Sequence, residues 1–332
     1  MSRPLRRALL ALVAVLALAL TITACGSDDS DSDSGSSGGS SSSSSGGSSG
    51  KLIKADPANK GKKITVGSKN FAEEFILGEI YSQALTAAGF DVKKQLDLGS
   101  EQIAYKAVKS GDVDMYPEYS GTALTSFYRV KAEDVPRDKD KAFDLLKQDA
   151  AKDQITALPQ TPYQNTFVIT STKKTAASLG NPKTISELVA KVGNSKSISG
   201  FPECKTRTDC LLGLKARYNW SPKFVSSEGK FDDLDKGQAD FTFGFGTDGE
   251  LSLDKYATYQ DDKQLFPPYY ISLLTRNQAV QTLGQSGQDV IQQVQKPLTE
   301  QVMQELNSRV SIDKQEPKKV AHDYLKESGF IK

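Results

Sequence analysis

Histidine is almost absent from this sequence of 332 residues, in which His322 is the only one. It lies in a helical pattern near the C-terminal end, with no cysteine or second histidine nearby. Histidine-based metal centres and catalytic triads need a second suitable group, so the sequence argues against both. We expect no metal, no cofactor and no enzymatic activity.

An excess of charge of either sign is also missing, because 42 lysines and arginines face 41 aspartates and glutamates. Three of the basic residues, Arg3, Arg6 and Arg7, stand at the start of the chain. Without them 39 basic residues remain against 41 acidic ones, a net charge of −2. This balance gives no indication of a nucleic-acid partner.

A long apolar run occurs at the beginning of the chain, where ALLALVAVLALALTI follows the three arginines. This order is typical of an export signal, which we assign to residues 1–24. The run leads into ITAC, which ends at Cys25 and resembles the lipobox of bacterial lipoproteins; the resemblance implies cleavage before Cys25 and a lipid on its sulfur. The alternatives are an ordinary signal peptide with a chance cysteine and a retained membrane span, for which the run is short.

Residues 26–50 contain only serine, glycine and aspartate. Without apolar side chains they cannot offset the entropy lost on ordering, so we expect a flexible tether over residues 25–60. The tether would hold a folded domain near the extracytoplasmic face of the cell membrane. The residues that follow, roughly 280, suffice for two α/β lobes with their own cores.

Two cysteines remain after Cys25, and they stand six positions apart in CKTRTDC. In an exported protein this pair favours a disulfide between Cys204 and Cys210, whose main effect would be to fix the shape of the residues between them. Two free thiols are the alternative.

Strand and helix patterns alternate through the first part of the domain. KKITVGS (62–68) predicts a strand, residues 70–89 a helix, residues 100–111 a second helix and DVDMY (112–116) a short strand. This alternation predicts a mostly parallel α/β sheet.

A second α/β set follows, and the C-terminal part is helical from about residue 278. Within this set, Thr184 and Glu187 have the spacing of a capping box. The predicted strands are 165–171, 196–200, 223–227 and 239–245, and the predicted helices 183–193 and 210–220. We expect lobe 1 over 61–162, lobe 2 over 163–269 and a return to lobe 1 over 270–332, with a ligand cleft between the lobes.

One segment, GFGTDG (244–249), matches a dinucleotide-binding fingerprint. It lies late in the chain and no clean helical pattern follows it, so we interpret it as a turn after a strand.

Four aromatic residues stand beside glycine, proline or a strand end, where loops border a cleft. If they converge, their ring faces would form a cage for a cation that has no N–H to donate, such as a trimethylammonium group. They are Tyr119, Phe167, Phe245 and Tyr269.

The segments ITVGSKNFAEEFILGEI, SGDVDMYPEYSGTAL and DDKQLFPPYY together resemble the substrate-binding lipoproteins of osmoprotectant ABC importers. The resemblance covers most of the chain from about residue 62. It implies a type II periplasmic-binding-protein fold, with two α/β lobes, in a monomer that binds glycine betaine, choline, carnitine or a related compound and delivers it to a permease.

The resemblance also implies roles for particular residues. The family's cage of four tyrosines corresponds to the four aromatic positions above, two of which are phenylalanine here and keep the ring face without the hydroxyl. A neighbouring ring, Tyr116 or Tyr163, is an alternative member. The carboxylate-binding groups correspond to Lys69, Thr122 and Arg207, whereas Asn165 corresponds to a position whose backbone carbonyl faces the cation, so that its side chain should matter little.

Three further roles stay open as hypotheses. Glu118 and Asp114 either line the cleft or orient the loop around them, and Gly121 lets the backbone approach the ligand. The disulfide would hold Arg207 in place before the ligand arrives, so its reduction should weaken the binding of carboxylate ligands.

The function that we expect is the capture of a quaternary-ammonium osmolyte by a binding protein of an ABC importer. The same fold could instead hold a neutral aromatic compound or a polyol, since the two phenylalanines make the cage more apolar. An exported enzyme and a purely structural envelope lipoprotein are the rivals from other classes.

Overall fold

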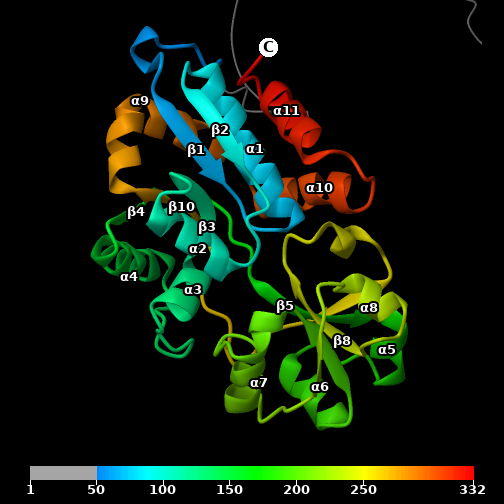
Figure 1. The fold of residues 1–332 in the computed structure, drawn as a ribbon. Helices are drawn as coiled ribbons and strands as arrows, with labels where there is room; N and C mark the ends of the chain where they lie inside the picture. Colours follow the sequence, from blue (N-terminus) through cyan, green and yellow to red (C-terminus); the bar gives the residue numbers. More distant parts are fainter. Residues whose placement is uncertain (1–50) are drawn as a thin grey trace, which may run out of the picture. The chain divides into compact units, whose positions relative to one another are not determined.

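Two five-stranded sheets organise the part of the chain that the computed structural model describes, residues 51–332. Figure 1 shows them with their helices, which form two lobes. The strand order is β2-β1-β3-β10-β4 in the first sheet and β7-β6-β8-β5-β9 in the second. The predicted export signal, Cys25 and most of the predicted tether lie outside the described residues.

The first sheet is parallel only in part. Strand β1 pairs in parallel with β2 and β3, as the alternation of strands and helices predicted, whereas β10 is antiparallel to both β3 and β4. The strands are β1 (Lys63–Gly67), β2 (Asp91–Gln95), β3 (Met115–Tyr119), β4 (Ile155–Ala157) and β10 (Ile271–Arg276).

The predicted strand at 112–116 begins three residues later than expected and continues to Tyr119. All five residues of β3 are buried, including Pro117. A central strand tolerates this proline because β1 pairs with β3 only at Met115, so the missing N–H leaves no gap in that ladder. The segment YPEY therefore belongs to a core strand, and only the residues after it leave the sheet.

Two helices of the first lobe, α1 and α2, end at the glycines that the sequence predicted. Gly89 (φ +97°) follows α1, and Gly111 (φ +88°) caps α2, each in the left-handed region that glycine adopts without strain. The C-terminal helix α11 packs along α1 (Figure 1). The helices are α1 (Ala72–Ala87), α2 (Glu101–Ser110), α3 (Ser120–Thr122), α4 (Lys139–Lys152), α9 (Asn277–Gln295), α10 (Glu300–Ser311) and α11 (Pro317–Glu327), with the short turns η1 (Pro57–Asn59) and η2 (Ala123–Phe127).

The second lobe has mixed pairing as well, since β5 is antiparallel to β8 and β9. Thr184 caps α6 by accepting the N–H of Glu187 at 3.1 Å, as predicted. The segment GFGTDG is the end of β8 and a turn, which confirms that interpretation. The elements are β5 (Phe167–Thr172), β6 (Ser197–Gly200), β7 (Lys223–Ser226), β8 (Phe241–Phe245), β9 (Tyr256–Tyr259), α5 (Lys173–Ser178), α6 (Ile185–Val192), α7 (Leu211–Tyr218), α8 (Phe231–Asp235), η3 (Pro202–Lys205) and η4 (Gly249–Ser252).

Two segments carry the chain between the sheets, one after β4 and one before β10. They lie side by side: Asn165 N–H donates to the carbonyl of Tyr269 at 3.0 Å, and Gln164 forms a bridge with Tyr270. A continuous apolar cluster runs through this crossing and includes Tyr163, Phe167 and Tyr269. The crossing is therefore part of the core, and it fixes side chains that face both lobes. Within residues 51–332, no helix has the length and apolar character needed to span a bilayer.

Candidate functional site

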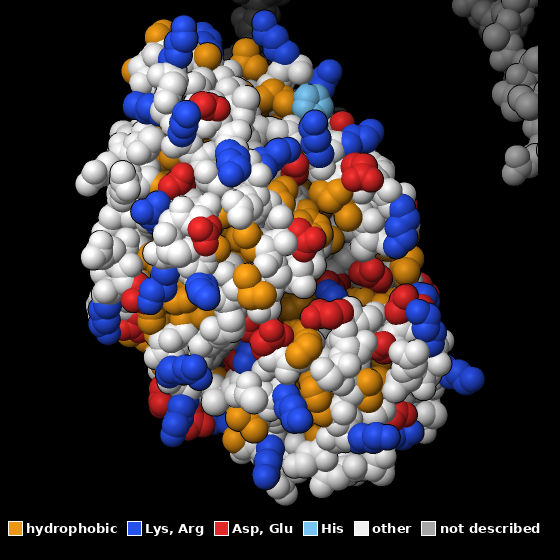
Figure 2. Space-filling view, in the orientation of Figure 1, with side chains coloured by type: hydrophobic (Ala, Val, Ile, Leu, Met, Phe, Trp, Pro, Cys, Tyr) orange, Lys and Arg blue, Asp and Glu red, His pale blue; other side chains and the backbone are white. Residues whose placement is uncertain are grey.

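One cavity collects side chains from both lobes and from the crossing segments. Its empty volume, which includes open solvent at the mouth, is about 740 Å³. Figure 2 shows a hollow between the two lobes, with acidic side chains around it. All eight residues predicted to bind ligand line this cavity: Lys69, Tyr119, Thr122, Asn165, Phe167, Arg207, Phe245 and Tyr269.

The four predicted aromatic residues are connected by ring contacts. The ring of Phe167 lies 5.0 Å from that of Phe245 and 5.4 Å from that of Tyr269, centroid to centroid. Tyr119 joins them through Phe71, whose ring lies 6.2 Å from Tyr119 and 6.2 Å from Phe245. The predicted convergence of rings is present, and Phe71 is a part of it that the sequence did not reveal.

The alternative rings do not reach the cavity. Tyr116 is fully buried in a separate apolar cluster, where its hydroxyl donates to Glu118 at 2.9 Å. Tyr163 is buried in the core at the crossing and is absent from the cavity lining. Phe167 and Phe245, in contrast, both line the cavity.

Lys69 lies between the end of β1 and the start of α1, as predicted, but its charge already has partners. Its Nζ donates to Oε1 of Glu118 at 2.5 Å and lies 3.6 Å from Oε1 of Glu74. Burial lowers the pKa of Lys69, yet Glu118 and Glu74 outweigh this effect and raise the pKa above its usual value. The ammonium also lies 4.4 Å from the ring centroid of Tyr119. Lys69 is thus a fixed, neutralised cation beside the cage.

Arg207 is likewise paired, so the expected free fork for a ligand carboxylate is not present. Its Nε and Nη2 donate to the two carboxylate oxygens of Asp209 at 2.8 and 2.6 Å. Asp209 also accepts the hydroxyls of Tyr269 at 2.7 Å and Thr125 at 2.9 Å. Burial raises the pKa of Asp209, but Arg207 outweighs it and holds the pKa below its usual range. The remaining terminal nitrogen, Nη1, donates to Glu101 at 3.2 Å across the cleft.

The disulfide forms as predicted, between Cys204 and Cys210, and both cysteines are fully buried. It closes the loop that carries Arg207 from η3 to the start of α7. Thr122 lies opposite on α3, where its hydroxyl oxygen accepts Nη2 of Arg207 at 3.4 Å. The two residues therefore connect the lobes at the cavity.

Glu73 accepts hydrogen bonds from four side chains, two of which, Tyr119 and Asn165, line the cavity. Its carboxylate accepts the hydroxyl of Tyr119 at 2.8 Å, the amides of Asn165 and Asn307 at 3.1 and 3.0 Å, and the hydroxyl of Thr247. Burial raises the pKa of Glu73 despite these donors. The side chain of Asn165, which we expected to matter little for the ligand, has a structural role: its amide donates to Glu73 and accepts the backbone N–H of Thr247 at 3.3 Å.

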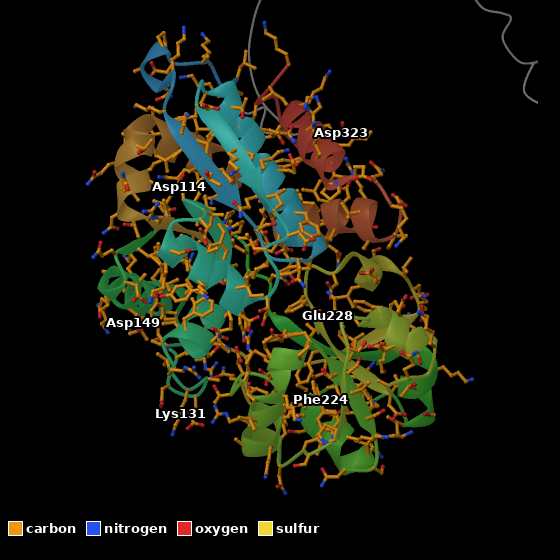
Figure 3. The ribbon with its side chains drawn as sticks, in the orientation of Figure 1. Asp114, Lys131, Asp149, Phe224, Glu228 and Asp323 are labelled. Carbon is orange, nitrogen blue, oxygen red and sulfur yellow. A yellow bond between two sulfur atoms is a disulfide. The ribbon has the colours of Figure 1, made fainter. Side chains whose placement is uncertain are left out.

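The positions of Glu118, Asp114 and Gly121 bear on the roles that the sequence left open for them. Glu118 is fully buried behind the cavity, where it accepts Lys69 and the N–H of Tyr119, so it orients this region. Asp114 accepts the N–H of Thr65 at 2.7 Å, outside the cavity lining (labelled in Figure 3). Gly121 makes room for a side chain rather than for ligand, since a Cβ there would lie 2.6 Å from Cε1 of Tyr269.

Several lining residues were not predicted. Among them are the rings of Phe71 and Phe201, and Phe201 stacks on Phe167 at 6.1 Å. The others that carry charge are Glu101, Glu203, Glu228 and Lys230. Within residues 51–332, no group of three or more histidine, cysteine or acidic side chains is placed to hold a metal ion. The arrangement is suited to holding a small cation against aromatic faces.

Comparisons with known proteins agree with this geometry. A family model described as the substrate binding domain of ABC-type glycine betaine transport systems matches residues 62–327. The glycine-betaine-binding protein of Pseudomonas aeruginosa is 28% identical over 283 residues, 81% of this chain and 88% of that protein. The glycine betaine-binding protein YehZ of Escherichia coli K12 is 25% identical over 289 residues, 83% of this chain and 94% of that protein.

The fold is similar to that of solved structures with the same architecture. A crystal structure of a glycine betaine/carnitine/choline ABC transporter has a TM-score of 0.64 and 24% identity to this chain. The match covers 80% of this chain and 98% of that one. The predicted two-lobed periplasmic-binding-protein fold is therefore confirmed.

Proposed function

We propose that this chain, which belongs to the family of substrate-binding domains of ABC-type glycine betaine transport systems, captures a quaternary-ammonium solute in its cavity. It then delivers the solute to the permease of an importer and performs no reaction on it. The observation that carries the proposal is the convergence of four rings on one cavity: Tyr119 from the first sheet, Phe167 and Phe245 from the second, and Tyr269 from a crossing segment.

The chemistry of the cation explains why rings are suitable partners. A trimethylammonium group has no N–H, so it cannot donate the hydrogen bond of an ordinary salt bridge. It is instead attracted by the negative face of an aromatic ring, with a gain of about 0.5–2 kcal/mol for each ring. Phe167 and Phe245 supply such faces as tyrosine would. Glycine betaine and choline both belong to this class and differ only at the end opposite the cation.

Capture would couple the two lobes. A solute held between Tyr119 on one side and Phe167 and Phe245 on the other contacts both lobes, so binding stabilises the arrangement in which they approach one another. Contacts across the cleft already exist, since Arg207 bonds Glu101 at 3.2 Å. The permease would recognise this approached form.

Attachment to the membrane completes the proposal. The lipobox-like ITAC supports acylation of Cys25 after removal of residues 1–24, and the tether over 25–60 would let a monomeric domain turn toward its permease. We assign 61–162 and 270–332 to the first lobe and 163–269 to the second.

Calorimetric titration of the full chain, purified in detergent, with glycine betaine, choline, carnitine and proline betaine tests the function. We expect at least one of them to bind. Tyr269→Ala should weaken that binding roughly tenfold or more, because it removes a cage ring. Tyr270→Ala is the matched control, since Tyr270 is the next residue but does not line the cavity.

Two results would contradict the proposal. One is a folded protein that binds none of the four compounds. The other is an equal loss of affinity in the Tyr269→Ala and Tyr270→Ala variants, which would place the solute away from the cage.

A further inference from the structure

Three glutamates from different parts of the fold line the cavity. Glu101 begins α2 in the first lobe, Glu203 lies in η3, and Glu228 lies in the turn between β7 and α8. Figure 3 shows the labelled Glu228 where the two lobes face each other. Three different elements therefore place a carboxylate on the lining of one cavity.

Each basic side chain of the lining is paired with an acidic side chain outside the lining. Lys69 pairs with Glu118 and Arg207 with Asp209, and Lys230 donates to Asp248 at 2.6 Å. None of these three acidic partners lines the cavity. The three glutamates of the lining therefore give the cavity an excess of negative charge. Only Glu101 contacts a cation, through its ion pair with Arg207.

The other two glutamates have no structural partner. Throughout residues 51–332, no side chain or backbone N–H forms a hydrogen bond or ion pair with the carboxylate of Glu203 or Glu228. Burial and the charge of Glu203 raise the pKa of Glu228, the charge of Lys230 opposes the rise, and Glu101 adds to it. The three carboxylates therefore lie within reach of one another's field, and Lys230, which donates to Asp248, only partly offsets it. Side chains with no role in the fold are free to act on what enters the cavity.

We propose that Glu101, Glu203 and Glu228 make this cavity select quaternary ammonium compounds with a net positive charge over zwitterionic ones that carry a carboxylate. The inference rests on the proposed function and states which members of the solute class the site prefers. The electrostatic field of the three glutamates attracts a choline-like cation, which has no carboxylate and so needs no anion-binding group.

A zwitterion meets two penalties in the same cavity. Its carboxylate is repelled by the unpaired glutamates. The two groups that would receive it, Lys69 and Arg207, are held by Glu118 and Asp209, and a ligand carboxylate would have to compete with bonds of 2.5 to 2.8 Å. Because a buried fork that is already satisfied gains little from a second carboxylate, the competition favours the cation.

Titration calorimetry of the full chain in detergent with choline and glycine betaine tests the selection. We expect choline to bind more tightly. Glu203→Gln and Glu228→Gln should each weaken choline roughly three- to tenfold and reduce the ratio of the two affinities, as expected for partly exposed charges. Glu316→Gln, an exposed glutamate at the start of α11 outside the cavity, should leave both affinities unchanged.

The outcomes separate the inference from the function beneath it. Tighter binding of glycine betaine than of choline, or a ratio that neither glutamine variant changes, overturns the charge selection and leaves the quaternary-ammonium function standing. A folded protein that binds neither compound overturns both.

Discussion

Glu74 gives the sharpest prediction about stability. It lies on α1 with no exposed surface, and its Oε1 has no hydrogen-bonding partner among the described residues. Burial raises the pKa of Glu74 to about 8, although the nearby ammonium of Lys69 opposes the rise. The replacement Glu74→Gln keeps the shape of the side chain and removes its titration.

The sign of the effect follows from proton binding. In an unfolded chain a glutamate has a pKa near ~4.3. Between this value and about 8, the folded protein holds a proton on Glu74 that the unfolded chain has released. A rise in pH through this window therefore favours unfolding. At ~1.36 kcal/mol for each pKa unit, the loss reaches roughly 5 kcal/mol as an order of magnitude.

Urea denaturation of the wild-type and Glu74→Gln proteins at pH 5, 7 and 9 measures this loss. We expect the free energy of unfolding of the wild type to fall relative to that of the variant as the pH rises, with most of the change complete by pH 9. A difference that is the same at all three pH values would refute the reasoning. So would a wild type that gains stability over the variant at pH 9, because Glu74 would then be ionised and stabilised by Lys69.

Two further predictions concern the loop that carries the cation at the cavity. Asp209→Ala leaves Arg207 buried without its carboxylate partner and should lower the free energy of unfolding, measured in urea titrations, by about 3–5 kcal/mol. The control Asp232→Ala, at an exposed ion pair, should lower it by less than ~0.5 kcal/mol. Equal losses in the two variants would contradict this account. The double replacement Cys204→Ser and Cys210→Ser should cost about 2 kcal/mol, the value for so short a loop, and an unchanged midpoint of unfolding would show that the loop is held without the bridge.

Local patterns explain which parts of the fold the sequence predicted. Strands β1 and β3 and helices α1 and α2 follow from alternation, apolar spacing and the glycines that end the helices, all of which are properties of neighbouring residues. Strand β10 was missed although it is an interior strand of the first sheet, because its partners β3 and β4 lie far earlier in the chain. An apolar run such as ISLLTR carries no sign of where it will pair.

In the site, too, the features that depend on neighbouring residues were predicted, and those that depend on distant parts of the chain were not. The four predicted rings were found because each stands beside glycine, proline or a strand end. Phe71 has a comparable signal, since it lies four residues after the end of β1 at Gly67, and it could have been included. The sequence places Asp209 only two residues after Arg207, but it does not show that both groups are buried, because their burial depends on the approach of Tyr269 and Thr125 from other parts of the fold.

A crystal structure of the protein with choline would test the central claim most directly. We predict the trimethylammonium nitrogen within ~6 Å of the ring centroids of Phe167, Phe245 and Tyr269, the range of a cation–π contact. Choline bound outside this cavity, or with its cation turned away from the three rings, would contradict the assignment of the cage.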